Sequence, residues 1–153
     1  MFNVIIDTKE KQPWKLTGSS INEVVLHKLD TGDYTIQGYE HILTIERKKS
    51  TAEFAINIVE KRFPAFMQRM KEIQHSYMVM EFSYDDVLEF PRNSGIPKSK
   101  WARLQVSSNF MVKRISEYLV EYGVPIIFAG DRENAERVCQ SIMKEFYEKY
   151  STV

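Results

Sequence analysis

The sequence predicts an α/β fold in which a central sheet carries helices on both faces. Apolar runs and amphipathic segments alternate along the chain, with no repeats and no low-complexity tract. The composition, 43% hydrophobic and 27% charged over 153 residues, is that of one globular domain with room for a full core. Interleaved strands and helices pack most economically as helices around a sheet.

The first predicted elements are strands. Residues 2–7 (FNVIID) form a nearly continuous apolar run, which is typical of a strand covered on both faces. A second strand is predicted at 23–29. Residues 34–38 and 41–47 predict a hairpin around Gly38, because apolar and polar residues alternate along its second half.

The middle of the chain predicts two helices and a further strand. Ser50 or Thr51 can cap a helix over residues 52–58. Residues 62–73 repeat Phe, Met and Ile at helical spacing, so we expect a helix that turns this stripe into the core. The apolar segment 76–82 predicts a strand.

The last third predicts a loop and three regular elements. Residues 91–100 (PRNSGIPKSK) indicate a long loop. Helical sequence follows from about 101 to 122, with a break near 107–108 left open. We expect a buried strand at 124–129 and an amphipathic helix at 132–150.

Several functional classes are disfavoured by the composition. No apolar run approaches the roughly 20 residues of a membrane span, and we expect no leader before the first strand. A single cysteine, Cys139, excludes an internal disulfide, and no pair at ligand spacing predicts zinc. We therefore expect an intracellular protein of the cytoplasm or nucleoid (the host cytoplasm if viral), with no membrane partner and no small-molecule cofactor.

The charge is unevenly distributed, although its sum is zero. Residues 47–71 carry seven basic side chains against two acids, a net of +5, and residues 92–114 carry six basic side chains and no acid. For a nucleic-acid partner this distribution matters more than the sum, although either block taken alone is explained more simply as a solvated helix face.

Charged residues at the end of the predicted strand 41–47 indicate a functional site, because charged side chains are normally excluded from a buried strand. Side chains two apart on a strand share a face, so Glu46 and Lys48 point the same way and Arg47 points oppositely. The hairpin brings Asp33 near Glu46. Two carboxylates repel unless a cation lies between them, and such hard oxygen ligands suit Mg²⁺ or Mn²⁺.

The sequences of these segments, and their order along the chain, resemble those of the XPF (ERCC4-type) family of structure-specific nucleases. The family's Asp-x-Arg-Glu corresponds to residues 7–10, its Gly-Asp to residues 32–33, and its Glu-Arg-Lys to residues 46–48. The helix arginine of the family corresponds to Arg62. The likeness spans nearly the whole chain and implies a restriction-endonuclease-like core with a central mixed β-sheet flanked by helices. It further implies metal-dependent cutting of branched DNA, commonly by a homodimer.

The chain also departs from this family. Lys9 stands at the family's arginine, which keeps the charge but not the planar fork. Ala52 stands at an aspartate, with Glu53 next to it, and Phe66 stands at a glutamine. We expect one nuclease domain over residues 1–153, without the helix-hairpin-helix domain of longer relatives.

Six residues are assigned to the reaction by this resemblance: Asp33, Glu46, Lys48, Asp7, Glu10 and Arg47. The carboxylates of Asp33 and Glu46 hold the metal, and Lys48 positions the attacking water. Asp7 and Glu10 are auxiliary acids, and Arg47 contacts phosphate or braces the site. The residues expected to bind DNA are basic: Lys49, Arg62, Arg69, Lys98, Lys100 and Arg103.

Two other functions stay open. One is a catalytically silent DNA-binding or scaffolding subunit, which Ala52 favours and the intact Glu-Arg-Lys disfavours. The other is an enzyme of the same core acting on RNA or simple duplex. The apolar faces of 111–122 and 138–146 either form a dimer interface or cover the sheet.

Overall fold

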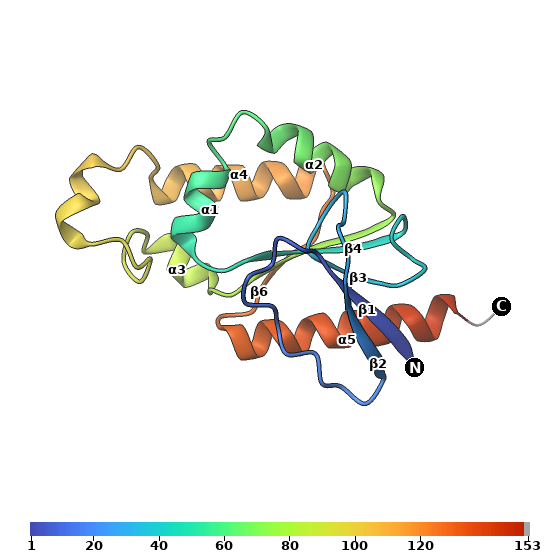
Figure 1. Cartoon of the computed structure of the whole chain (residues 1–153). Coiled ribbons are helices and arrows are strands. Elements are labelled where there is room, and N and C mark those ends of the chain that lie inside the picture. The colour runs from blue at the N-terminus through green and yellow to red at the C-terminus, as the bar shows by residue number, and fades with distance from the viewer. Residues whose placement is uncertain (152–153) are drawn as a thin grey trace.

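A mixed six-stranded sheet lies between two layers of helices in the computed structural model, which describes residues 1–151 (Figure 1). The strands are β1 (Phe2–Ile6), β2 (Ile21–Leu26), β3 (Tyr34–Ile36), β4 (Leu43–Lys48), β5 (His75–Met80) and β6 (Ile126–Phe128). Their order is β2-β1-β3-β4-β5-β6, and β3 runs antiparallel to both of its neighbours while all other pairs are parallel. The predicted α/β fold with a central mixed sheet is confirmed.

The helices cover both faces of this sheet. They are α1 (Thr51–Asn57), α2 (Phe63–Glu72), α3 (Tyr84–Leu88), the 3₁₀ helix η1 (Lys98–Arg103), α4 (Ser108–Glu121) and α5 (Arg132–Tyr150). Helix α5 lies along one face, and α1, α2 and α4 lie across the other (Figure 1). None of the helices in the described part of the chain is long and apolar enough to cross a membrane.

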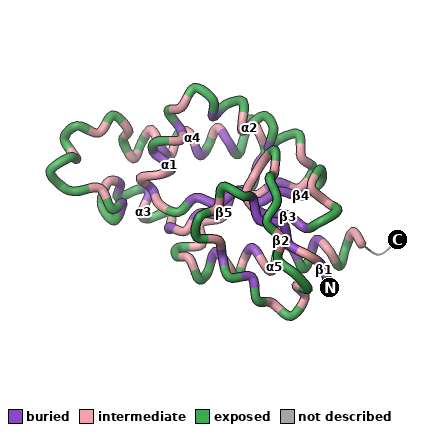
Figure 2. The backbone as a smooth tube through the Cα atoms, in the orientation of Figure 1, coloured by how far each residue is buried: buried purple, intermediate pink, exposed green. Residues whose placement is uncertain are grey.

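Strand β4 lies inside the sheet and is buried along its whole length. Leu43 and Ile45 pack in the core beneath α5, which confirms the predicted alternation of this strand. Glu46 and Lys48 therefore face the α1 and α2 layer, and Arg47 faces the α5 side. Figure 2 shows this burial as purple tube through β3 and β4.

The two edge strands differ from expectation. The segment predicted at 23–29 forms its strand at Ile21–Leu26, and most of it is exposed because it is an edge of the sheet. It ends before Leu29, whose backbone N–H donates to the Asp7 carboxylate at 2.8 Å instead of continuing a ladder. The last strand is β6, shorter than the predicted 124–129 and half-buried rather than buried, since it forms the other edge.

The region after β5 also differs from the prediction. Helix α3 was not expected, although Ser83 and Asp86 form a capping box at its start. The predicted helix at 101–122 is wrong at its beginning, because η1 ends at Arg103 and α4 begins only after Ser107, whose hydroxyl accepts from the Phe110 N–H. The break left open near 107–108 is thus present.

The apolar faces that left two interpretations open contribute mainly to the core. Met111 and Ile115 of α4 pack with α1 and α2, and Phe146 of α5 packs beneath the sheet. Leu119 stays 46% exposed. These helices therefore cover the sheet, and the homodimer stays a prediction.

Candidate active site

The hairpin of β3 and β4 brings Asp33 and Glu46 to one end of the sheet. The Asp33 N–H donates to the Ile45 carbonyl at 2.9 Å, and the Asp33 carboxylate accepts from the Arg47 N–H at 2.8 Å. Gly32 has φ of +84°, and a Cβ built on it would lie 1.8 Å from the Thr44 Oγ1. The turn into Asp33 therefore requires glycine.

The carboxylates of Asp33 and Glu46 lie close together and are largely shielded from solvent. Glu46 is only 9% exposed. The pKa of Asp33 is raised well above its ordinary value, first by burial and then by the charge of Glu46, against which the Arg47 N–H acts in the opposite direction. A cation bound at this pair would relieve the repulsion.

Lys48 lies on the same face as Glu46, as the strand pattern predicts. Its Nζ lies 2.9 Å from the Glu46 Oε2 and 2.7 Å from the Asn57 Oδ1. Burial is the largest single influence on the pKa of Lys48 and lowers it, but the charge and hydrogen bond of Glu46, together with the charges of Glu53 and Asp33, more than offset burial, so the pKa is raised. The amine is therefore a fixed ammonium group beside the carboxylates at neutral pH.

Arg47 lies on the opposite face and is not available to DNA. Its guanidinium is bonded to Glu10 at 2.8 Å and to Glu81 at 2.6 Å, and the side chain is 1% exposed. It also lies over the ring of Trp14, 5.1 Å from the centroid. Of the two roles that the sequence left open for Arg47, this position supports bracing and excludes a phosphate contact.

The two auxiliary acids lie in different places. Glu10 binds Arg47 and accepts from the Tyr34 hydroxyl at 2.7 Å, and it does not line the hollow of the carboxylate pair, although its charge contributes to the raised pKa of Asp33. Asp7 lies at the end of β1 and lines the same hollow as Asp33. Its carboxylate accepts from the N–H groups of Leu29 and Lys9, so it organises the loop that leads to Asp33.

A hollow of about 450 Å³ opens over the carboxylate pair. Asp33, Glu46 and Lys48 line it together with Arg62 and Arg69 of the α2 region. The predicted cluster of two acids and a lysine is thus present in one place. The Arg62 side chain is 83% exposed, although it pairs with Glu60, and Arg69 is exposed.

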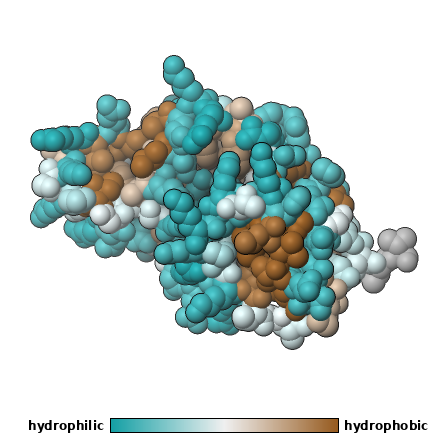
Figure 3. All heavy atoms as spheres, viewed as in Figure 1, coloured by the Kyte–Doolittle hydropathy of each residue, from teal (hydrophilic) through white to brown (hydrophobic). Residues whose placement is uncertain are grey.

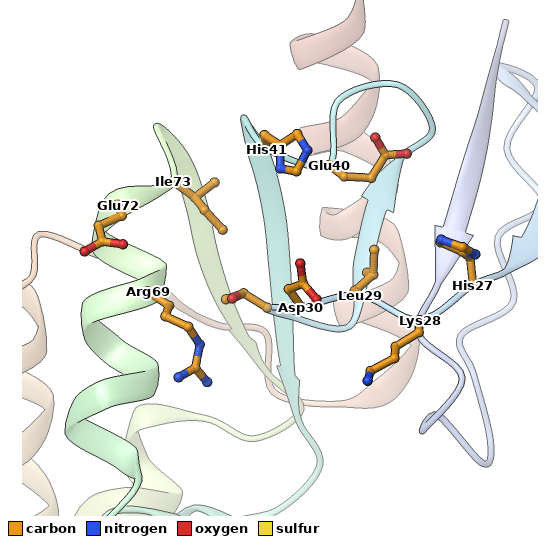
Figure 4. A pocket seen from close by; sticks show the side chains of 10 residues that line it. His27, Lys28, Leu29, Asp30, Glu40, His41, Arg69, Glu72 and Ile73 are labelled. Carbon is orange, nitrogen blue, oxygen red and sulfur yellow. The ribbon is translucent and has the colours of Figure 1, made fainter.

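A second hollow of about 550 Å³ adjoins the first across residues 29–31. Arg69 lines both hollows, and Figure 4 shows its guanidinium pointing the same way as the Lys28 amine on the far side of Asp30. Lys28 was not singled out by the sequence, because it lies outside both basic blocks.

The other basic residues lie away from this hollow. Lys49 is exposed just after β4, and Lys98, Lys100 and Arg103 are exposed on η1. Lys100 and Arg103 line an apolar groove of about 670 Å³ against α1. Figure 3 shows hydrophobic atoms gathered in this region, between α1 and the loop before α4. The predicted DNA-binding residues thus fall on two surfaces separated by α1.

The residues present fit a magnesium site in which the protein supplies only two ligands. No group of three or more His, Cys, Asp or Glu side chains able to hold a metal occurs within residues 1–151. Mg²⁺ usually keeps several waters and is bound by one or two carboxylates. The carboxylates of Asp33 and Glu46, which repel each other, can supply these two ligands. The Oε1 of Glu53 accepts from the Lys49 N–H at the start of α1, so this oxygen is not a ligand beside Asp33 and Glu46. Ala52 lines the apolar groove rather than the hollow.

Two polar residues beside the site were missed. Asn57 links Lys48 to Glu60, and Glu81 binds both Arg47 and the Trp14 indole N–H. Asn57 falls inside the predicted helix 52–58 and Glu81 inside the predicted strand 76–82, and neither position predicts these contacts. Both contacts join segments whose proximity depends on the whole fold.

Comparison with known proteins places the chain in context. The family model for the ERCC4 domain matches residues 6–142. No curated protein sequence matches the chain. Two solved structures share its fold, XPF from Aeropyrum pernix and the same protein in complex with DNA, each with 18% identity and a TM-score of 0.70 over 97% of this chain. The chain spans 67% and 66% of those two chains, about two thirds of their length.

Proposed function

This chain belongs to the ERCC4 domain family, and we propose that it is a metal-dependent endonuclease that cuts phosphodiester bonds in branched DNA. The observation that carries the proposal is the convergence of Asp33, Glu46 and Lys48 in one hollow. Two acids can hold a metal that activates water and phosphate, and an amine beside them can stabilise the charge that develops as a phosphodiester is hydrolysed. A solved structure of an XPF protein with DNA adds support for the ligand.

Asp33 and Glu46 would hold the metal, Mg²⁺ or Mn²⁺. When bound, this ion supplies Lewis-acid polarisation of the phosphate and lowers the pKa of a nearby water. Lys48 orients the attacking water and offsets the charge that grows on the phosphate oxygens. Glu46 holds the Lys48 ammonium in place at 2.9 Å, so its position is set before substrate arrives.

The surrounding basic side chains would bind the DNA backbone. Arg62 and Arg69 line the hollow and reach phosphates next to the one that is cut. Lys28 lines the adjoining hollow with Arg69, on the far side of Asp30 (Figure 4), and would extend this path. Lys49 and the basic residues of η1 bind the more distant duplex, and their contribution is expected to weaken as salt rises.

Cleavage of defined DNA structures tests the proposal. Labelled flap, fork, four-way junction and linear duplex are incubated with the protein, with and without Mg²⁺. We expect metal-dependent cutting of the branched substrates, abolished in Asp33→Asn and in Lys48→Ala. Glu133→Gln and Lys144→Ala, at exposed positions of α5, are matched controls that keep the activity. Cutting that survives in Asp33→Asn would contradict the proposed site.

A catalytically silent DNA-binding subunit is the second candidate function, and Ala52 favours it because the resembled family carries an aspartate there. Binding of branched DNA without cutting would support this candidate. Equal cutting of linear duplex or of RNA would instead indicate the same core with a different substrate. We also propose a homodimer, and sedimentation of the purified protein measures its mass directly.

A further inference from the structure

We propose that Asn57 is the positioning residue for the Lys48 amine, an inference that rests on the proposed nuclease function. Asn57 is the last residue of α1, and its side chain lines the hollow that holds the carboxylate pair. It belongs to none of the motifs that carry the family resemblance. Its effect is exerted through Lys48, which it contacts directly.

The contacts of Lys48 leave its amine little freedom. Its Nζ donates to the Asn57 Oδ1 at 2.7 Å and lies 2.9 Å from the Glu46 Oε2. A lysine ammonium has three N–H donors, so these contacts occupy two and leave one for water or phosphate. Asn57 and Glu46 together therefore decide where the third N–H points.

Two aromatic rings border the same amine. The Lys48 Nζ lies 5.6 Å from the ring centroid of Phe63 and 5.9 Å from that of Phe66, both on α2. These distances lie within the range of cation–π attraction. Phe66 is the residue that stands at the glutamine of the resembled family, so this border is a feature of the present chain.

Asn57 is itself held in one orientation. Its Nδ2 donates to the Glu60 Oε1 at 2.8 Å, while its Oδ1 accepts from Lys48. Rotation of the amide by 180° would set its NH₂ against the ammonium and its oxygen against the Glu60 carboxylate. Both contacts would then be repulsive, so the amide is fixed by the chemistry of its two neighbours.

Replacement of the amide tests this role in two ways. Asn57→Leu keeps the approximate shape and removes the acceptor. We expect kcat on branched DNA to fall about 10- to 100-fold, because a small displacement of a catalytic group has an effect of that size. KM for DNA should stay unchanged, since Asn57 contacts Lys48 rather than the backbone of the substrate. Asn57→Ala serves the same purpose if Asn57→Leu does not fold.

A swap variant and a neighbour provide the controls. Asn57→Asp combined with Glu60→Gln exchanges donor and acceptor between the two positions and keeps an acceptor toward Lys48, so it should recover kcat. Ile56→Ala alters the preceding residue of α1, which is 64% exposed and lines the apolar groove, and should change nothing. An unchanged kcat in Asn57→Leu, or no recovery in the swap variant, would overturn the inference.

An NMR measurement separates this inference from the proposed function. In lysine-labelled protein, the Lys48 Hε signals should be displaced by the two rings and should return toward ordinary values in Asn57→Leu. If the unaltered protein cuts no DNA, the proposed function fails, yet loss of this displacement still supports the contact. Retention of the full displacement in Asn57→Leu overturns it.

Discussion

Replacement of Arg47 by methionine is expected to destabilise the fold by about 3 to 5 kcal/mol. The guanidinium is 1% exposed, and its partners Glu10 and Glu81 each have side chains that are 9% exposed. Methionine fills much of the space but leaves two carboxylates buried without a cation. The Gln12 carbonyl loses a donor at 2.8 Å as well. For a chain of this length the loss corresponds to a fall in Tm of about 6 to 20 °C.

Thermal and urea unfolding followed by circular dichroism measure this effect. Arg62→Met is the matched control, because that side chain is 83% exposed and its pair with Glu60 contributes less than about 1 kcal/mol. Combining Arg47→Met with Glu10→Gln and Glu81→Gln should restore part of the loss, since no unpaired buried charge remains. A loss no larger than that of Arg62→Met would refute a bracing role for Arg47.

Three further outcomes are expected. Gly32→Ala should destabilise the fold by more than about 1 to 2 kcal/mol in urea unfolding, and by more than Gly38→Ala, because both have positive φ but only Gly32 meets Thr44. Asp33→Asn should raise Tm in the absence of divalent cations. The gain in Tm should grow as pH rises from about 4, because the raised pKa of Asp33 means that its charged form destabilises the fold, and a gain that shrinks with pH would contradict this. The Cys139 thiol, fully buried with its pKa raised by burial, should react with a thiol reagent only after unfolding, and fast reaction of the native protein would show that the α5 core opens.

The carboxylate and lysine cluster was predictable because its geometry is local to one hairpin. Strand periodicity alone places Glu46 and Lys48 on one face, and the short connection between β3 and β4 brings Glu46 back alongside Asp33. The apolar stripe of α2 was predictable for the same reason, since helical spacing selects Phe63 and Met67 for the core.

The partners of Arg47 were not predictable, because they depend on the order of the strands. Glu81 lies 34 residues away in sequence and becomes a neighbour only when β5 pairs with β4. The role of Asn57 was equally unpredictable, because its contact with Lys48 requires α1 to fold back over the strand that precedes it. The break before α4 was left open by the sequence, because Ser107, a capping residue, interrupts a stretch that otherwise favours helix.

Binding of Mn²⁺ to the purified protein, followed by isothermal titration calorimetry and by electron paramagnetic resonance, tests the central claim most directly. We expect a site that is competed by Mg²⁺, weakened in Asp33→Asn and in Glu46→Gln, and unaffected in Glu133→Gln. Binding that is the same in all four proteins, or absent from the unaltered protein with and without DNA, would contradict a cation site between Asp33 and Glu46.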